Sequence, residues 1–432
     1  MKTTSPSLQD IAAQVSGYDP DALPVAQAQE FIARLVPRVE AVEMVALRAS
    51  LGRVLARDLV SPFNVPAHDN SAMDGYALRG SDLAADAPTR LTLVGTGLAG
   101  QPFAGEVATG HCLRITTGAV MPSGLDTVVP QEFVKLDGGA VVIPPNVVRG
   151  GDNRRLAGED LAAGRPALSA GRVLRPADLG LIASLGVAEV PVWRRLRVAF
   201  FSTGDELRSI GEPLDAGCVY DSNRYTLWGM LKRLGVDLLD LGVVRDEPAA
   251  LAAAFRQAAA SADAVITSGG VSVGEADHTK RIMAELGEVL FWRIAMRPGR
   301  PMAIGRIGSL ADDGHRAILF GLPGNPVAVM VTFYAFVRDA LLAMSGANAE
   351  PLPMLRAASV AAIRKKPGRT EYQRGVVTRG ADGAWQVSIT GSQGSGILRS
   401  MSVANGLVVL GHDQGSVAAG APVDVLPFDG LI

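Results

Sequence analysis

The chain has 432 residues, 48% of them hydrophobic and 19% charged, with a formal net charge of −2. This composition excludes an intrinsically disordered chain. The near-zero charge excludes a global basic field that would hold nucleic acid or an anionic membrane. At roughly 150 residues per domain, the length predicts about three domains. Any anionic ligand must therefore be held by a local cluster of cations and backbone N–H groups.

The cysteines and the first residues indicate the compartment. Cys112 and Cys218 lie far apart without CxxC spacing, which argues against a disulfide framework or a zinc site and favours a reducing, cytoplasmic location. The start, MKTTSPSLQD, lacks the pattern of a secretory signal. No uninterrupted apolar run reaches the ~20 residues of a membrane helix. Residues 249–265 come closest, but Arg256 and Asp263 interrupt them. We expect a soluble protein.

The first half of the chain changes character twice. Apolar residues at helical spacing predict a helix at residues 24–36, and a second periodic segment runs up to Pro62. Residues 90–145 are short β-rich runs separated by Gly and Pro, which predicts a small all-β module. Helical patterning then returns and ends near Gly186. The β module is therefore predicted to be an insertion into an N-terminal domain formed by both flanking segments.

The second half predicts an α/β domain followed by a β domain. Between residues 192 and 345, apolar strands alternate with helical stretches, the signature of a mostly parallel sheet in a three-layer α/β/α domain. Residues 350–432 revert to short strands with Gly-rich turns, which predicts a small β barrel. The chain is thus predicted to be an α/β multidomain protein. The predicted division is an elongated N-terminal domain (1–60 and 150–190), an inserted β domain (61–149), an α/β/α domain (191–346) and a C-terminal β barrel (347–432).

The loop TSGGVSVGEADHTK, residues 267–280, carries the strongest chemical signal. It follows a predicted strand and precedes a predicted helix, where parallel sheets bind ligands. Gly269 and Gly270 allow backbone N–H groups to approach a ligand closely. The alternative is a capped helix after a glycine turn. The Gly269–Gly270 pair, two serines, two carboxylates and a lysine exceed what a cap needs. We predict a ligand-binding loop.

Acidic residues follow two other strands of the predicted sheet. STGDEL supplies Glu206, and LGVVRDEP supplies Asp246. Together with Asp277 these carboxylates would repel one another unless a cation compensates. Mg²⁺, bound partly through water and substrate phosphate, fits that need. The alternative is that each acid only caps a helix.

Positive charge is concentrated in FWRIAMRPGRP. In an extended strand Arg293 and Arg297 would project from one face, and Pro298-Gly299 would deliver Arg300. Two arginines on an otherwise apolar strand indicate an anion site or buried ion pairs. GLPGNP, residues 321–326, then forms a rigid turn before an apolar helix and predicts a second anion-binding N-terminus.

No further catalytic constellation is evident. The histidines do not fall at metal-ligand spacing, and there is no GxSxG, Walker A or GxGxxG motif. The residues predicted to bind the ligand are Ser202, Thr203, Gly204, Ser268, Gly269, Gly270, Ser272, Gly274, Lys280, Pro323, Gly324, Asn325 and Pro326.

The full set of motifs resembles the molybdopterin molybdenumtransferases, bacterial enzymes related to the gephyrin E domain. The motifs occur in the family's order and the likeness extends from about residue 24 to 430: DNSAMDGYA, STGDEL, TSGGVSVGEADHTK, RPGRP and GLPGNP. The resemblance implies a homodimer whose cleft is shared with N-terminal segments of the other subunit. It also implies insertion of molybdate into adenylylated molybdopterin with Mg²⁺-dependent release of AMP, and a contact with the molybdopterin adenylyltransferase.

The same resemblance assigns roles to individual positions. The implied catalytic residues are Asp69, Thr117, Asp160, Glu206, Asp246 and Asp277. The implied Mg²⁺ ligands are Glu206, Asp246 and Asp277. The predicted oxyanion-binding residues are Arg293, Arg297, Arg300, Arg369, Ser395 and Ser400.

Two departures from the family pattern leave alternatives open. Many members carry lysines where this chain has arginines at 293, 297 and 300, and guanidinium is planar and bidentate whereas ammonium is compact. His68 replaces a common aromatic residue. A diverged paralogue, tungstate as the oxyanion, and a non-catalytic molybdopterin-binding scaffold are alternatives; a scaffold would lose the acidic residues. A nucleotide-sugar or nicotinamide enzyme is disfavoured by the missing dinucleotide fingerprint.

Overall fold

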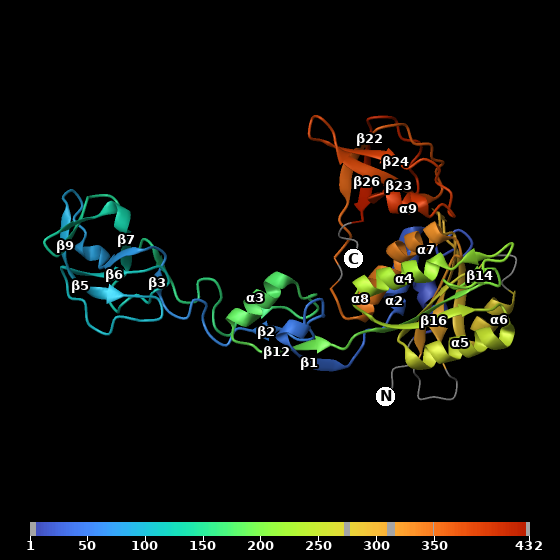
Figure 1. The fold of residues 1–432 in the computed structure, drawn as a ribbon, viewed down its shortest axis with the longest axis horizontal. Helices are drawn as coiled ribbons and strands as arrows, with labels where there is room; N and C mark the ends of the chain where they lie inside the picture. Colours follow the sequence, from blue (N-terminus) through green and yellow to red (C-terminus); the bar gives the residue numbers. More distant parts are fainter. Residues whose placement is uncertain (1–5, 272–276, 309–315, 349, 429–432) are drawn as a thin grey trace.

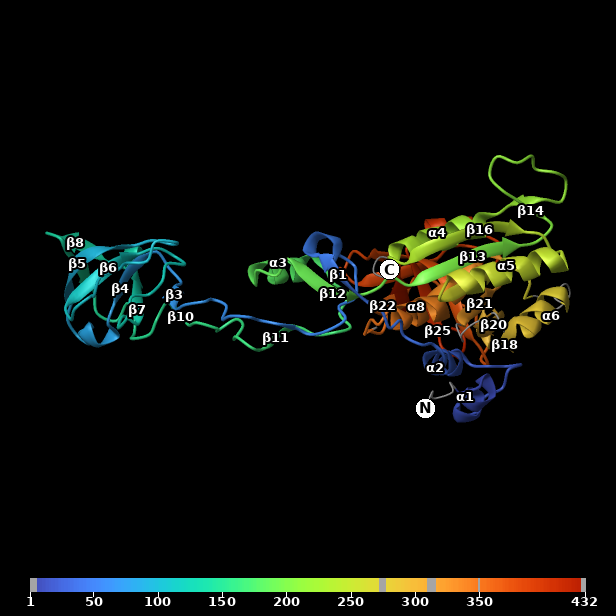
Figure 2. The same cartoon turned by 90° about the horizontal axis from the view of Figure 1, so that it is seen from below.

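A computed structural model describes residues 6–271, 277–308, 316–348 and 350–428. The molecule is elongated (Figure 1), with a β domain at one end, a thin stalk in the middle, and the α/β domain at the other end. The C-terminal domain sits beside the α/β domain, away from the β domain. Figure 2 shows the same separation from a second direction.

The first two helices pack on the α/β domain. Helices α1 (Leu8–Gln14) and α2 (Val25–Leu35) bury their apolar faces in the same core as the central sheet. The ring of Phe31 meets Trp292 edge-on at 5.1 Å. The predicted N-terminal domain of residues 1–60 and 150–190 therefore differs from the structure at its start. Helical periodicity locates a buried face but does not specify what covers it.

The stalk consists of short antiparallel pairs between the outgoing and returning chain. The pairs are β1 (Val42–Ala46) with β12 (Glu189–Trp193), β2 (Leu59–Val60) with β11 (Pro166–Leu168), and β3 (Asn70–Ser71) with β10 (Arg154–Arg155). Helix α3 (Pro176–Ser184) and the 3-10 turn η1 (Leu47–Ala49) flank the first pair, around a small core of their own. The segment that leads to the β domain and the segment that returns from it thus lie side by side along the stalk.

The β domain is a six-stranded sheet in the order β7-β4-β6-β5-β9-β8. Its strands are β4 (Gly75–Leu78), β5 (Thr89–Gly97), β6 (His111–Ile115), β7 (Thr127–Pro130), β8 (Lys135–Asp137) and β9 (Ala140–Ile143), with short 3-10 turns η2 (Gly80–Asp82) and η3 (Gln131–Phe133). Apolar side chains form two separate clusters in this domain. A Cβ at position 75 would lie 2.0 Å from the carbonyl oxygen of Val129, so the β4–β7 pairing requires glycine.

The α/β domain contains a six-stranded sheet in the order β16-β13-β17-β21-β20-β18. The parallel strands are β13 (Arg197–Thr203), β16 (Asp237–Val244), β17 (Ala264–Ser268) and β21 (Ala317–Leu322). Strands β18 (Gly287–Arg293) and β20 (Pro301–Ile307) are antiparallel. The mostly parallel sheet is confirmed, although β20 was not predicted because a proline and a glycine weaken its strand pattern.

Helices cover both faces of this sheet and complete three layers. One face packs on α4 (Ser222–Arg233) and on the continuous segment α7 (Pro326–Thr332), η4 (Phe333–Val337) and α8 (Arg338–Met344). The other face packs on α5 (Pro248–Ser261) and α6 (Asp277–Leu286). The predicted three-layer architecture is confirmed.

One helical segment has the length and apolarity of a membrane span. Among the described residues it is Pro326–Met344, with a mean hydropathy of 1.7, rather than residues 249–265. The structure buries 67% of its most apolar window in the core of the α/β domain. The apolarity of this helix is therefore used for internal packing.

The C-terminal domain is a closed five-stranded barrel. Its strands are β22 (Leu355–Ser359), β23 (Thr370–Arg379), β24 (Trp385–Ile389), β25 (Gly406–Leu410) and β26 (Pro422–Pro427). Pairing of β23 with β25 closes the ring, and α9 (Arg399–Val403) packs against β23. Strand β19 (Met296–Arg297) leaves the α/β domain and pairs with β23. This pairing holds the two domains together next to the arginine segment.

Candidate functional site

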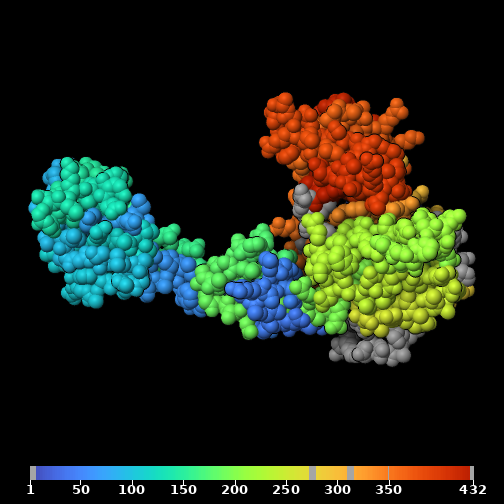
Figure 3. Space-filling model, viewed as in Figure 1, coloured from blue at the N-terminus to red at the C-terminus, as the bar shows by residue number. Residues whose placement is uncertain are grey.

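A cleft of about 640 Å³ lies between the α/β domain and the C-terminal barrel. Its floor is formed by the carboxyl ends of β13, β17 and β21, and its opposite wall by residues 369 and 393–395. Figure 3 shows the barrel seated on the α/β domain, whereas the β domain stands apart from both. The position agrees with the rule that parallel sheets bind ligands beyond their strand ends.

The floor of the cleft is a buried polar network. Thr203, Ser268 and Gly269 line it, as predicted from the strand-end motifs. Asn223, at the start of α4, donates from Nδ2 to Ser268 Oγ at 2.8 Å and to the Gly324 carbonyl oxygen at 2.7 Å. Its Oδ1 atom is buried without a hydrogen-bond partner among the described residues. Asn223 therefore joins two of the predicted loops and keeps one free acceptor at the cleft.

The acidic side of the cleft carries Glu206 and Asp246. The hydroxyl of Thr203 donates to Asp246 Oδ1, and the Asp246 backbone N–H donates to Asp205 Oδ1 at 3.2 Å. Gly204 adopts a φ of +154°, which favours glycine, and a Cβ there would lie 2.5 Å from the Glu206 carboxylate, so a larger residue would displace the end of that side chain. The side chain of Asp277 lies outside the described residues.

The donor set on this side suits a weakly held hard cation. Within the described part of the chain, no three His, Cys, Asp or Glu residues form a metal-binding group. Mg²⁺ usually binds through one or two carboxylates plus substrate phosphates and water, which two cleft carboxylates satisfy. Glu206 and Asp246 thus fit the predicted Mg²⁺ site together with a phosphate ligand.

Arginines form the cationic side. Arg297 and Arg300 line the cleft on either side of the Pro298–Gly299 turn. Arg293 does not line it, and its guanidinium lies 3.8 Å from Asp21. Arg293 and Arg297 were expected to project from one face of a single strand, and this expectation is wrong. Strand β18 ends at Arg293, and the chain then bends so that Arg297 lies in β19, which pairs with the barrel.

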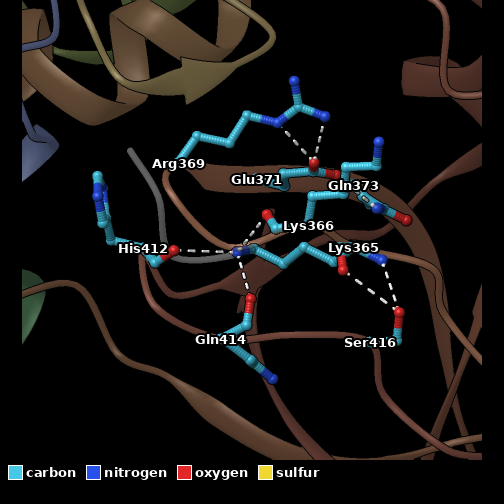
Figure 4. Close-up of polar contacts among 8 residues, drawn as sticks. All are labelled: Lys365, Lys366, Arg369, Glu371, Gln373, His412, Gln414 and Ser416. Carbon is cyan, nitrogen blue, oxygen red and sulfur yellow. Dashed lines mark hydrogen bonds and ion pairs between the residues drawn. The ribbon is translucent and has the colours of Figure 1, made fainter.

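The barrel contributes a third arginine, which a carboxylate holds in place. Arg369 donates from Nε and from a terminal nitrogen to Glu371 Oε1, both at 2.8 Å (Figure 4). Glu371 is 2% exposed, and its second oxygen accepts from Gln373 Nε2 at 3.0 Å. Two sides of the Arg369 guanidinium are therefore fixed, and its remaining donors are available to the cleft that it lines.

A buried lysine supports the segment that leads to Arg369. Lys365 Nζ donates to the carbonyl oxygens of Gln414 at 2.6 Å and of Lys366 and His412 at 3.3 Å (Figure 4). Burial lowers the pKa of Lys365. Its three donors are all used by the backbone, so Lys365 ties two turns of the barrel together instead of facing a ligand.

Several predicted site residues lie elsewhere. Ser202 is buried and donates to Asp221 Oδ1 at 3.0 Å, on the side opposite to Thr203. Lys280 Nζ lies 5.5 Å from the centre of the Phe291 ring, and Ser400 accepts from a buried arginine, Arg374. Pro326 begins α7 but does not line the cleft, whereas Ser395 does. Ser272 and Gly274 lie outside the described residues. The other predicted residues that line the cleft are Gly204, Gly270, Pro323, Gly324 and Asn325.

The three N-terminal candidates are far from this cleft within one chain. Thr117 lies in the β domain and donates its N–H and hydroxyl to Asp74 Oδ1 at 2.7 and 2.9 Å, which lowers the pKa of Asp74. Asp69 lies at the outer end of the stalk and accepts from the Ala157 N–H at 2.8 Å. Asp160 is exposed on the returning chain nearby. Figures 1 and 2 place this end of the molecule opposite the α/β domain.

Sequence reasoning missed Asn223, Thr279 and Gln393, all of which line the cleft. Asn223 and Gln393 come from segments that are distant in sequence from the motifs they join, so spacing gives no signal for them. Thr279 lies in the central loop motif itself and is 3% exposed. A hydroxyl in the first turn of a helix after a glycine-rich loop was a usable signal.

Comparison with known proteins gives one consistent result. Three family models match: the MoeA N-terminal region (domain I and II) at residues 23–186, a probable molybdopterin binding domain at 199–343, and the MoeA C-terminal region (domain IV) at 356–428. A molybdopterin molybdenumtransferase of Haemophilus influenzae is 39% identical over 407 residues, covering 94% of this chain and 98% of that protein. One from Nostoc is 37% identical, covering 93% of each.

The solved structures agree with the sequence relatives. The crystal structure of the molybdopterin biosynthesis MoeA protein of Pyrococcus horikoshii matches with a TM-score of 0.80 and 28% identity. The match covers 94% of this chain and 99% of that one.

Proposed function

Because this chain belongs to the molybdopterin molybdenumtransferase family, we propose that it inserts molybdate into adenylylated molybdopterin with Mg²⁺-dependent release of AMP. One observation carries the proposal. A single cleft presents carboxylates and glycine-rich strand ends on one side and three arginines on the other. That pairing suits a substrate with a pyrophosphate at one end and a reaction partner that is a free oxyanion.

The glycine-rich side would bind the adenylylated pterin. Gly269 and Gly270 adopt positive φ values of 97° and 71°, which presents their backbone to the cleft without a side chain. The free Oδ1 of Asn223 is an acceptor for a donor group of the ligand. Glu206 and Asp246 would hold Mg²⁺, which neutralises pyrophosphate charge when bound. Water adds to one phosphorus of the phosphoanhydride, the bond from that phosphorus to the bridging oxygen breaks, and the products are AMP and the pterin phosphate. Glu206 and Asp246 would act on this step through the cation that they hold.

The arginine side would hold the oxyanion. Arg297, Arg300 and Arg369 offer planar sets of N–H donors to the tetrahedral oxygens of molybdate. Ser395 adds a hydroxyl at the same wall. Fixing the oxyanion beside the pterin sulfurs converts a bimolecular encounter into a positioned one, which lowers the entropic barrier to metal insertion.

We propose further that the N-terminal candidates complete the cleft of a second subunit. Asp69 precedes β3, Thr117 follows β6, and Asp160 lies between β10 and β11. Figure 2 shows these strands in the stalk and the β domain, away from the α/β domain. A two-fold symmetric dimer would bring the β-domain end of one subunit to the cleft of the other. The cytoplasmic location and the contact with the adenylyltransferase belong to the same proposal, as does the predicted domain division except for α1 and α2, which pack on the α/β domain.

The direct test supplies adenylylated molybdopterin, molybdate and Mg²⁺ and measures AMP. AMP release is expected to require both molybdate and Mg²⁺ and to stop when EDTA is added. Arg297→Ala should remove the dependence on molybdate, while Arg197→Ala, an exposed arginine at the far end of β13, should leave it unchanged. Folded protein that releases no AMP would refute the proposal.

A further inference from the structure

Arg374 is fully buried directly behind the barrel wall of the cleft. It lies in β23 with 0% exposure, and it does not line the cleft. Its guanidinium donates to the carbonyl oxygens of Gly394 at 2.8 Å, Gln393 at 3.3 Å and Ser392 at 3.4 Å. Three consecutive carbonyls of the segment 392–394 thus point away from the cleft and toward one side chain.

Other contacts of Arg374 fix the same segment. Its Nε donates to Ser400 Oγ at 2.9 Å, and its backbone N–H donates to Gln393 Oε1 at 2.8 Å. Its own carbonyl oxygen accepts from the Thr390 N–H at 2.9 Å. Gln393 and Gly394 both line the cleft, so all of these contacts except the one to Ser400 anchor the loop (residues 390–395) that forms its barrel wall.

Within the described part of the chain, the charge of Arg374 has no carboxylate partner. Among the described residues, no Asp or Glu oxygen lies within ion-pair distance of its guanidinium. Burial and the neighbouring positive charge of Arg297 lower its pKa. Arg369, in contrast, forms an ion pair with Glu371. A buried, unpaired cation beside another cation is unfavourable unless an anion compensates, and the cleft is where such an anion has room.

We propose that Arg374 is a positioning residue for the oxyanion: it shapes the loop 390–395 against the cleft, and its buried charge favours an anion there. The inference rests on the proposed function in taking the ligand to be an oxyanion. It also reassigns Ser400, which acts through Arg374 instead of touching the ligand. Ser395, which does line the cleft, is the serine available to the ligand.

The test compares Arg374→Gln and Arg374→Lys with Arg379→Gln. Arg379 is an exposed arginine on the same strand, stacked 4.7 Å over the Trp385 ring, so its replacement removes the same charge far from the cleft. Binding of molybdate and of tungstate to the full-length protein is measured by equilibrium dialysis with metal analysis. Thermal unfolding is recorded for each variant.

Arg374→Gln is expected to weaken oxyanion binding at least tenfold, and Arg379→Gln by less than twofold. Arg374→Lys keeps the charge and should recover part of the affinity. In the AMP assay, the KM for molybdate should rise in Arg374→Gln, whereas the KM for adenylylated molybdopterin stays within twofold. Equal affinities in Arg374→Gln and Arg379→Gln would overturn the inference, as would Arg374→Lys binding no better than Arg374→Gln.

A second variant guards against misfolding. Ser400→Ala removes one acceptor and keeps the guanidinium, so its oxyanion affinity should stay within threefold of the unmodified protein. If Arg374→Gln unfolds, a loss of tenfold or more in Ser400→Ala overturns the charge role. Oxyanion binding without AMP release would refute the proposed function and leave this inference standing. A wild-type protein that binds neither oxyanion would overturn the inference itself.

Discussion

The acidic residues of the cleft and those at the outer end of the stalk have different surroundings. In the cleft, Glu206 and Asp246 face a cavity whose other side is cationic. At the outer end, Asp74 and Asp69 are engaged by local N–H and hydroxyl donors and lie near solvent. The first arrangement is a ligand site within one chain. The second gains a chemical role only when another surface covers it, which is why a dimer is part of the proposed function.

The largest expected effect tests the cleft side of this comparison. Asp246→Asn removes a carboxylate from the acidic side and weakens the contact with Thr203. AMP release should fall by about 10²–10³, the usual loss when a preorganised electrostatic group is removed. The control is Asp237→Asn at the opposite end of β16. AMP release within threefold of wild type in Asp246→Asn would place the reaction elsewhere.

The next test asks whether the two regions meet across subunits. Asp69→Asn and Asp246→Asn variants are purified separately, found inactive, and then mixed under conditions that exchange subunits. Random pairing should restore about a quarter of wild-type AMP release, because half of the dimers are mixed and each of these has one intact cleft. No recovery despite verified exchange would show that both residues must belong to one chain.

A smaller effect concerns the support of the barrel wall. Lys365→Met removes the ammonium group that donates to three backbone carbonyl oxygens, of which, among the described residues, only that of His412 keeps another donor, the Gly368 N–H. The free energy of unfolding should fall by about 1–3 kcal/mol, the usual cost of unsatisfied buried polar groups. Thermal or denaturant unfolding measures it. Lys366→Met, at an exposed neighbouring position, is the matched control and should change stability little.

The smallest effect compares the two thiols. Burial raises the pKa of Cys112 in the β domain to about 12, from a usual value of 9.0. Its thiol stays protonated in the folded protein, so the associated stability is present below pH 9 and declines as pH rises toward 12. At pH 8, iodoacetamide should modify the partly exposed Cys218 and spare Cys112. Mass spectrometry showing equal labelling would contradict the buried position of Cys112.

The layered fold was predictable because strand and helix periods are local properties. The alternation in residues 192–345 predicted the α/β/α domain, and the short C-terminal strands predicted the barrel. The element that covers an apolar helix face can be distant in sequence, so a local pattern does not identify it. For this reason α2 was assigned to the N-terminal domain, whereas it packs on the α/β domain. Strand β20 was missed because Pro301 and Gly305 weaken its local strand pattern, and only its pairing with β18 and β21 reveals it.

The residues of the candidate site could be predicted only where a sequence motif lies at the carboxyl end of a strand. Thr203 and Ser268 are the last residues of β13 and β17, and both line the cleft, although the register pairs Ser268 with Ser202. Ser202 precedes Thr203 by one residue and therefore points to the opposite face, toward Asp221. Asn223 and Arg374 come from other segments, and only the tertiary structure shows that they hold the predicted loops together.

The paired strands of the stalk have a consequence for protein engineering. Because β3 and β10 are antiparallel neighbours, the chain enters and leaves the β domain at one spot, roughly 5 Å apart. The segment between residues 71 and 154 is thus an inserted domain whose two ends are neighbours. A short turn joining residue 71 to residue 154 would excise it, and the same junction would accept the corresponding segment of a relative.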